Sequence, residues 1–302
     1  MNHIRVVYLV EDLKIGGLER VLATLVTRLD RRLYFPEVWC LASGGRIARE
    51  LDQKGIPVRI LGCTSYHRPD YMLRLARLLR RANPDILHTH GYFAGTFGRL
   101  ISAFSGPAIR IHHVHTTDHG LTARHLRIER ILARITHTVV CISEAVRRFV
   151  VDREGIPIKK TRVIYNGVEW PGPAGPNDRS VPVMNWPDPG FVVTTIGSLT
   201  PHKGHHILIQ AFQMLSERHP EMRMVIVGDG PLRWKLSEQV RRANLHEKVW
   251  FTGELESVFP VLYQTDLFAL PSMNREGLSI AAIEAAASGL AIVASNLGGI
   301  PE

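Results

Sequence analysis

Two glutamates in the last part of the chain are spaced so that they could contact opposite ends of one ligand. Glu276 and Glu284 are eight residues apart in a stretch with a helical pattern. In a helix, this spacing separates two side chains by roughly 12 Å along the axis and about 80° around it, so the carboxylates cannot grip one atom. Gly277 lets a ligand approach the backbone, and free amides of a first helical turn suit phosphate. A nucleotide sugar has this reach, although an ordinary amphipathic helix with two solvated acids has the same pattern.

A lysine and two glycines follow other strand ends. The stretch Ile196–Gly204 indicates a strand, a loop and a helix start, and Lys203 within it could neutralise a diphosphate above the strand ends. The order GxxxxGK[ST] is absent, so this is no P-loop, and a solvated loop lysine is the alternative. Gly16 and Gly17 permit a tight turn and backbone contact with a ligand after the first strand, or serve the turn alone. Because the GxGxxG form is missing, we expect no NAD site.

Histidines gather near the ends of two strands in the first half of the chain. They are His88, His90, His112, His113, His115 and His119. A metal site is conceivable from their number, but His-Xaa-His at one strand end is weak evidence, and we expect none. A strand-end histidine is better placed to bond a sugar hydroxyl or a phosphate. No Asp-Xaa-Asp pair is present to hold a divalent metal on a diphosphate, so Lys203 and helix N-termini must stabilise that charge.

The elements that position these residues alternate between short β-rich runs and longer helical patterns. This alternation predicts parallel sheets of α/β class. In the first half the predicted strands are 5–10, 37–41, 58–61, 85–88, 109–113, 138–142 and 162–165. In the second half they are 191–196, 224–227, 249–251, 267–270 and 291–294. We therefore predict two Rossmann-like domains that face each other across a cleft, with ligands at the carboxyl ends of the strands.

Length and proline usage predict where the domains divide. A chain of 302 residues is long for one core and comfortable for two. Prolines and glycines crowd residues 171–190, which predicts a linker there. The predicted domains are residues 1–170 and 191–302.

Charge is unevenly distributed along the chain. Residues 1–178 hold 27 Lys and Arg against 16 Asp and Glu, net +11, whereas residues 179–302 are net −2. Arginines fall on helix faces at 74, 77, 80 and 81 and at 124, 127, 130 and 134. The leucines at 75, 78 and 79 supply apolar surface to the first of these faces. These faces are either solvated or dock on an anionic membrane. Nucleic acid is not expected as a partner, because few aromatic residues are interleaved with the charges.

The composition favours a cytoplasmic protein. The N-terminal apolar run is too short for a signal peptide, and no apolar run is long enough to span a membrane. Cys40, Cys63 and Cys141 are far apart and lie in or beside apolar runs, as reduced structural thiols do. The expected location is therefore the cytoplasm, with peripheral attachment at the inner face of the cell membrane.

Taken together, the motifs resemble the GT-B glycosyltransferases of family 4. The motifs that carry the resemblance occur in that family's order over essentially the whole chain. They are Gly16–Arg20, His88–Gly91, Val140–Glu144, Val163–Val168, Gly197–Gly204, Val227–Pro231 and Pro271–Gly299.

The resemblance implies a metal-independent, cofactor-free transfer of a hexosyl group with retention, from a nucleotide-diphosphate sugar to a hydroxyl acceptor. The first domain would bind the acceptor and the second the donor. Glu276 would contact donor-sugar hydroxyls, Glu284 the ribose, and Lys203 the diphosphate. His115 would be the active-site histidine of the first domain. The other implied donor-site residues are Gly16, Gly17, Ser198, Gly277, Leu278 and Ser279.

Two departures from the family accompany this resemblance. Many members carry an arginine where this chain has Ser198, and Arg275 or His202 would have to substitute for it. Members also continue past Glu302, so we expect the second domain to be C-terminally short and incomplete. The leading hypothesis is a transferase of cell-envelope or exopolysaccharide biosynthesis with a lipid-linked or polysaccharide acceptor. A sugar-nucleotide epimerase of the same fold and a non-catalytic nucleotide-sugar-binding homologue are the alternatives.

Overall fold

The computed structural model describes residues 3–14, 16–63, 68–117, 120–173 and 190–302. The chain divides into two compact units, Met1–Asn166 together with Glu302, and Gly167–Pro301. Most of the predicted linker 171–190 lies outside the described residues, as does His119. At the start of that segment, the backbone oxygen of Gly172 accepts a hydrogen bond of 2.6 Å from the Tyr263 hydroxyl.

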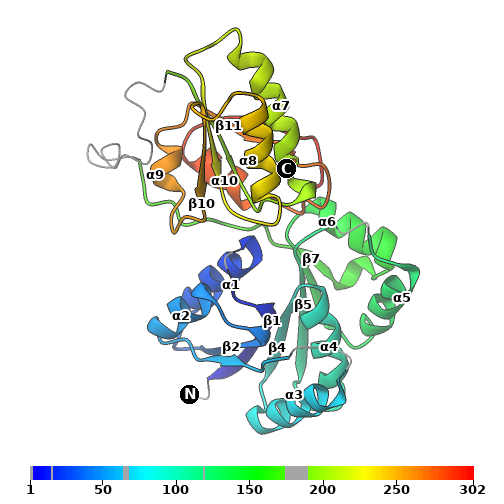
Figure 1. The fold of residues 1–302 in the computed structure, drawn as a ribbon. Helices are drawn as coiled ribbons and strands as arrows, with labels where there is room; N and C mark the ends of the chain where they lie inside the picture. The colour runs from blue at the N-terminus through cyan, green and yellow to red at the C-terminus, as the bar shows by residue number, and fades with distance from the viewer. Residues whose placement is uncertain (1–2, 15, 64–67, 118–119, 174–189) are drawn as a thin grey trace. The chain divides into compact units, whose positions relative to one another are not determined.

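The first unit is built on a sheet whose seven described strands pair in parallel (Figure 1). Their order is β3-β2-β1-β4-β5-β6-β7. The strands are β1 Ile4–Asp12, β2 Tyr34–Ser43, β3 Val58–Ile60, β4 Ile86–His90, β5 Ile109–Val114, β6 Thr138–Cys141 and β7 Thr161–Val163. Every strand predicted in this half is confirmed, with ends that differ by a few residues.

Helices cover both faces of this sheet, because both faces of its strands are apolar. Val6, Tyr8 and Val10 of β1 pack in one core cluster with side chains of α1 (Gly17–Thr27) and α2 (Arg46–Gln53). Val7 and Leu9 pack on the opposite face with α3 (Pro69–Ala82) and α4 (Tyr92–Ser102). Alternate residues of a strand point to opposite faces, so a strand buried on both sides is a continuous apolar run. The helical segments are α1 Gly17–Thr27, α2 Arg46–Gln53, α3 Pro69–Ala82, α4 Tyr92–Ser102, α5 Ala123–Leu132, α6 Glu144–Phe149, η1 Val150–Glu154 and η2 Ile158–Lys160.

The second unit repeats the plan with five described parallel strands in the order β10-β9-β8-β11-β12. The strands are β8 Val192–Ile196, β9 Arg223–Val227, β10 Val249–Gly253, β11 Leu267–Leu270 and β12 Ala291–Ala294. The helical segments are η3 Pro201–Lys203, α7 His205–Ser216, α8 Arg233–Arg242, α9 Phe259–Leu262 and α10 Ile280–Ala287. Met224 and Ile226 of β9 face one core cluster, and Val225 and Val227 face another. The predicted strands of this half and the α/β class are confirmed.

Each sheet contains one point where the chain reverses the direction in which strands are added. In the first unit this point lies between β1 and β4, and in the second between β8 and β11. Loops that leave neighbouring strands in opposite directions open a crevice at such a point, where open α/β sheets bind ligands. Ser198 lies in the loop after β8, Lys203 ends the short helix η3 that follows this loop, and Glu276 lies in the loop after β11.

Candidate functional site

The switch point of the second unit brings together a lysine and a glutamate that are 73 residues apart in sequence. The Lys203 Nζ atom lies 2.5 Å from Glu276 Oε1, and the Ser272 hydroxyl donates a hydrogen bond of 2.6 Å to the same oxygen. The Glu276 side chain is 6% exposed, whereas the Lys203 side chain is 20% exposed. The carboxylate is therefore oriented by two donors, and the ammonium is the more accessible partner.

Glycines allow the loops around this pair to pack backbone against backbone. Gly204, just after Lys203, has φ of 70°, and a Cβ atom there would overlap the backbone oxygen of Pro271. Gly298 has φ of 56°, and a Cβ atom there would overlap the backbone oxygen of Glu276. Both positions lie in the left-handed region that favours glycine. This close packing positions the loops that follow β8, β11 and β12 around Glu276.

The expectation that a helix separates Glu276 from Glu284 is wrong. Helix α10 begins at Ile280, with Ser279 as its N-cap, so Glu276 lies in the preceding loop. Arg275 has φ of 64°, which turns the backbone immediately before Glu276. A non-glycine residue in this region is uncommon and usually held there by its surroundings. The helical distance and angle predicted for the two carboxylates therefore do not apply, although Glu284 does lie within α10 and is half-buried.

The predicted amide donors Gly277, Leu278 and Ser279 precede α10 rather than forming its first turn. The Ser279 side chain accepts a hydrogen bond of 3.3 Å from the Ala282 amide. One amide at this helix start is thus already bonded by the cap. Ser198 is exposed, and its hydroxyl lies 3.3 Å from Thr200 Oγ1.

In the first unit, the predicted glycines lie at the β1/β4 switch point. Gly16 is the N-cap of α1 in extended conformation and Gly17 is the first helical residue. Glu19 of the first turn reaches back, so that a Cβ atom on Gly16 would overlap its carboxylate. Burial raises the pKa of Glu19 to about 7. Glu19 is not among the site residues predicted from the sequence. An acidic residue in the first helical turn after a Gly-Gly pair could have indicated it.

The strand-end histidines lie side by side because β4 and β5 pair in register. His88 is paired with Ile111 and His90 with His113. His88, His90 and His113 are buried, with exposures of 8%, 1% and 5%. His90 Nδ1 lies 3.0 Å from His115 Nε2.

These contacts change the interpretation of two histidines. His88 and His90 are buried, which does not support the expectation that they bond a sugar hydroxyl or a phosphate. His115, in contrast, is partly exposed. His112 points to the opposite face of the sheet, where its Nδ1 lies 3.0 Å from Thr89 Oγ1. It is therefore not part of the group that His90 and His113 form.

Burial determines how these imidazoles titrate. It holds the pKa of His88, His90, His112 and His115 well below the ordinary value of 6.5, with neighbouring histidines adding to the shift. Burial lowers the pKa of His113 to about 4. The unfolded chain therefore binds more protons than the folded chain as the pH falls from about 6.5 towards these lowered values.

We predict that, in EDTA, the free energy of unfolding falls by roughly 1–3 kcal/mol when the pH is lowered from 7 to 5.5. The histidine contribution to stability is fully present above pH 6.5 and is lost as the pH falls below it. Two buried acids oppose this loss, because burial raises the pKa of Glu19 to about 7 and of Glu154 to about 8. Above pH 4.5 these two carboxyl groups hold more protons in the folded chain than in the unfolded chain, so their contribution to stability increases as the pH falls. Urea unfolding in EDTA at several pH values measures the sum, and stability that rises from pH 7 to 5.5 would contradict the prediction.

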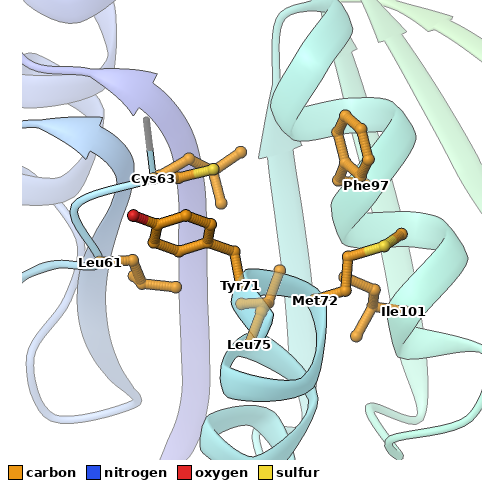
Figure 2. Close-up of a pocket in the computed structure, with 8 residues that line it drawn as sticks. Leu61, Cys63, Tyr71, Met72, Leu75, Phe97 and Ile101 are labelled. Atoms are coloured by element: carbon orange, nitrogen blue, oxygen red, sulfur yellow. The ribbon is translucent and has the colours of Figure 1, made fainter. Parts of the chain in front are cut away.

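A small apolar pocket, open in part to solvent, lies elsewhere in the first unit (Figure 2). Its lining comes from the ends of β2 and β3 and from α3 and α4. The lining residues are Leu41, Leu61, Cys63, Tyr71, Met72, Leu75, Phe97 and Ile101. None of the predicted site residues is among them.

Comparison with known proteins defines the class to which this fold and site belong. Residues 15–169 match the family model described as Glycosyltransferase Family 4, and residues 177–302 match Glycosyl transferases group 1. The chain belongs to glycosyltransferase family 4.

Two curated relatives are similar to the chain in sequence. The chain is 28% identical over 240 residues to the UDP-Gal:alpha-D-GlcNAc-diphosphoundecaprenol alpha-1,3-galactosyltransferase of Escherichia coli, covering 76% of this chain and 62% of that protein. It is 25% identical over 240 residues to the phosphatidylinositol N-acetylglucosaminyltransferase gpi3 subunit of Schizosaccharomyces pombe, covering 74% of this chain and 48% of that protein. The chain thus spans less than two thirds of the length of these relatives.

A solved structure matches over nearly the whole chain. The crystal structure of Anabaena Alr3699/HepE in complex with UDP-glucose superposes with a TM-score of 0.84 at 26% identity, covering 98% of this chain and 82% of that chain. The fold is therefore of the two-domain GT-B type.

Proposed function

We propose that this chain transfers a hexosyl group from a nucleotide-diphosphate sugar to a hydroxyl acceptor, with retention at the anomeric carbon. The observation that carries the proposal is the Lys203–Glu276 pair at the β8/β11 switch point. An accessible ammonium beside an oriented, buried carboxylate suits a ligand that is anionic at its diphosphate and rich in hydroxyls at its sugar. The UDP-glucose complex of the HepE structure supports a nucleotide-sugar donor.

The transfer step makes its main demand on leaving-group stabilisation. The bond from the anomeric carbon to the diphosphate breaks, and a bond to the acceptor oxygen forms on the same face. The acceptor proton passes to the departing diphosphate, so no side-chain nucleophile and no metal are needed. In this proposal Lys203 neutralises the diphosphate, Glu276 binds sugar hydroxyls, and Glu284 binds the ribose.

The remaining predicted residues take supporting roles in this proposal. Backbone amides of Gly277, Leu278 and Ser279 approach the sugar and phosphate, with Ser198 beside Lys203. Gly16, Gly17 and His115 belong to the first unit, where the glycines line a ligand site and His115 is the active-site histidine of that unit. The 3.0 Å contact of His115 with His90 fixes the direction of its ring.

The nucleotide-sugar assay that tests this proposal uses a panel of UDP, GDP and ADP sugars, with release of the nucleoside diphosphate as the readout. Product analysis with and without a hydroxyl acceptor then separates the outcomes. An acceptor-dependent glycoside supports transfer. Isomerised sugar formed without acceptor would identify an epimerase, and binding without turnover would identify a non-catalytic protein.

We predict that Glu284→Ala abolishes the thermal stabilisation that the preferred nucleotide gives. The reason is that removal of the carboxylate leaves the ribose hydroxyls without their charged acceptor. Differential scanning fluorimetry with UDP, GDP and ADP measures the shift. Glu247→Ala is the matched control, because Glu247 is exposed in the same unit. An unchanged shift in Glu284→Ala would refute the ribose contact.

We further propose a lipid-linked acceptor and peripheral docking on an anionic membrane at the cytoplasmic face, in cell-envelope or exopolysaccharide biosynthesis. The names of the two relatives, a diphosphoundecaprenol and a phosphatidylinositol transferase, support the lipid-linked acceptor. In the described part of the chain, no helix combines the length and apolar character needed to cross a bilayer.

The arginine faces support docking in a modified form. All eight arginines are exposed on or beside α3 and α5. Leu75 and Leu79, in contrast, are buried in the core rather than available to lipid. The exposed apolar side chains nearby are instead Leu73 at 55%, Phe104 at 76% and Ile131 at 55%.

We predict that Arg77→Gln with Arg81→Gln weakens binding to anionic vesicles roughly 30-fold, because each basic residue near the surface contributes on the order of 1 kcal/mol. Flotation with phosphatidylserine-containing and neutral liposomes measures this. Arg49→Gln with Arg218→Gln, which removes the same charge from other elements, is the control. Equal binding of the unmodified protein to both vesicle types would contradict electrostatic docking.

A further inference from the structure

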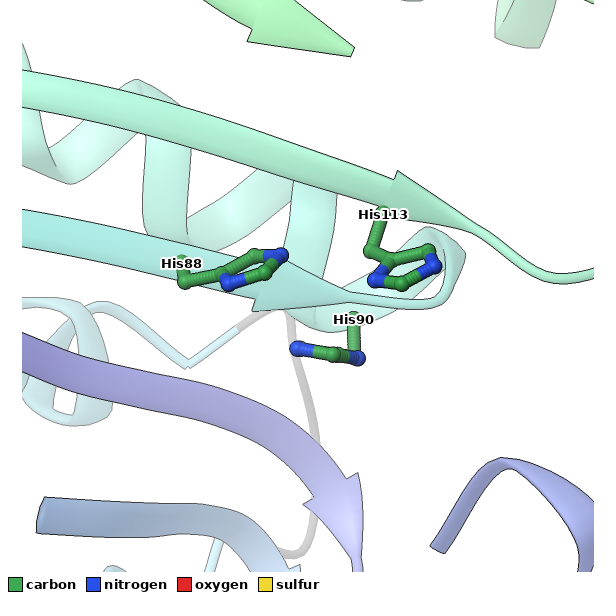
Figure 3. A group of neighbouring side chains, drawn as sticks. All are labelled: His88, His90 and His113. Carbon is green, nitrogen blue, oxygen red and sulfur yellow. The ribbon is translucent and has the colours of Figure 1, made fainter. Parts of the chain in front are cut away.

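Three buried imidazoles meet where β4 and β5 end (Figure 3). One ring nitrogen from each of His88, His90 and His113 lies within 4.8 Å of the others. Parallel pairing places His90 opposite His113, and His88 lies on the same face two residues earlier. The rings of His88 and His113 are stacked, with centroids 5.5 Å apart.

The ring nitrogens of this group are not satisfied by the surrounding protein. His88 Nε2, His90 Nε2 and both ring nitrogens of His113 are buried and have no hydrogen-bond partner among the described residues. A buried polar atom without a partner costs about 1–3 kcal/mol, so four such atoms in one place require a cause. In an ordinary histidine core, backbone or hydroxyl groups would bond them, as Thr89 bonds His112 on the opposite face of this sheet.

The orientation of His90 is that of a metal-binding histidine whose second ring nitrogen forms a hydrogen bond to a neighbouring residue. Its Nδ1 lies 3.0 Å from His115 Nε2. When Nδ1 carries the proton and donates to His115, Nε2 presents a lone pair towards the group. Metal-bound histidines almost always donate their second ring N–H in this way, which fixes the tautomer and the ring orientation. Burial also keeps the three imidazoles neutral, which is the form that binds metal.

We propose that His88, His90 and His113 bind a divalent transition metal ion of the zinc class. Three imidazoles suit Zn²⁺, which takes nitrogen ligands at about 2.0–2.1 Å and leaves a fourth position for solvent. Small rotations of the rings would draw the nitrogens inward to that distance. The ion would tie β4 to β5 and fix His115 through His90. No metal site was expected from sequence, because His-Xaa-His supplies two ligands and the third comes from another strand.

The full chain, stripped with EDTA, is the protein for the test. Titration with Co²⁺ as a spectroscopic probe should give d–d absorption typical of nitrogen ligands in tetrahedral geometry, saturating at one ion per chain. Zn²⁺ should displace the Co²⁺ and raise the unfolding midpoint by at least about 3 °C. Failure of the unmodified protein to bind either ion, or binding without a tetrahedral spectrum, would overturn the proposal.

His113→Phe separates the site from the core. Phenylalanine keeps a ring against His88 and removes two unsatisfied nitrogens, so the metal-free variant should be at least as stable as the metal-free parent. Its affinity for Zn²⁺ should fall at least about 100-fold, which exceeds the usual loss of an outer partner. His90→Gln serves as a second ligand variant if His113→Phe folds poorly, and His246→Gln, an exposed histidine of the second unit, is the control. Unchanged Zn²⁺ affinity in either ligand variant would show that metal binds only at surface histidines, and would refute the proposal.

Discussion

Replacing Lys203 by methionine is expected to lower kcat for glycosyl transfer roughly 100- to 1000-fold, the usual cost of removing one well-placed group that stabilises developing charge. Methionine retains the length of the side chain and removes the ammonium that lies 2.5 Å from Glu276. In the proposed mechanism the diphosphate gains negative charge as it departs, so we expect the effect mainly on kcat rather than on KM. Steady-state kinetics with the preferred donor measure both constants.

A second measurement separates catalysis from folding in this variant. Loss of the ammonium leaves the Glu276 carboxylate buried with its Ser272 bond, which destabilises the loop. Lys203→Met combined with Glu276→Gln removes the charge of the buried carboxylate and should recover stability without recovering kcat. Lys235→Met, an exposed lysine of α8, is the matched control and should keep full activity. A kcat within threefold of the parent in Lys203→Met would contradict the assigned role.

The second large effect concerns a buried ion pair in the first unit, where Arg99→Met is expected to destabilise the protein by about 3–5 kcal/mol. Arg99 and Glu129 are 0% and 1% exposed, with Arg99 Nη2 2.5 Å from Glu129 Oε2. The Arg99 Nε atom also donates to the backbone oxygen of Gly95 at 2.8 Å. Removal of the guanidinium therefore leaves Glu129 as an uncompensated buried charge. Burial and the nearby Glu129 raise the pKa of Glu154 to about 8, so Glu154 adds little negative charge at neutral pH.

Urea unfolding followed by circular dichroism measures this loss. Arg99→Met with Glu129→Leu should be less destabilised than Arg99→Met alone, because the double variant contains no unpaired charge. Arg241→Met is the matched control, since its ion pair with Glu238 is at the surface and the Arg241 side chain is 71% exposed. A surface ion pair of this kind contributes about 1 kcal/mol or less to the free energy of unfolding. Similar losses for Arg99→Met and Arg241→Met would show that burial does not govern the Arg99 pair.

The central strands were predictable from local pattern because both of their faces are buried, as in β1 and β9, whereas β12 is exposed along its length. Val6 to Val10 is a continuous apolar run, and its alternate side chains fill two separate core clusters. Such runs, separated by helix-length segments, allow few arrangements other than a parallel sheet. The candidate loops were predictable for the same reason, since the carboxyl ends of parallel strands lie at one edge.

The local conformation within those loops was less predictable. Helical spacing was expected between Glu276 and Glu284, but the helix begins at Ile280. The apolar residues after Gly277 resemble a helix in pattern, whereas the loop is determined by contacts with Gly298 and by the φ of 64° at Arg275. Neither the contact with Gly298 nor the backbone angle of Arg275 produces a periodic pattern in the sequence near Glu276.

Apolar periodicity and strand-end motifs were sufficient to establish the α/β class, the order of strands along the chain and the family resemblance, because each depends on residues close together in sequence. The partnership of Lys203 with Glu276, and of His88 and His90 with His113, depends on which strands become neighbours and in what register. That choice results from packing over the whole unit, where β11 inserts beside β8 and β5 beside β4. For this reason the residues that could do chemistry were visible in the sequence, while the groups they form became visible only in the folded chain.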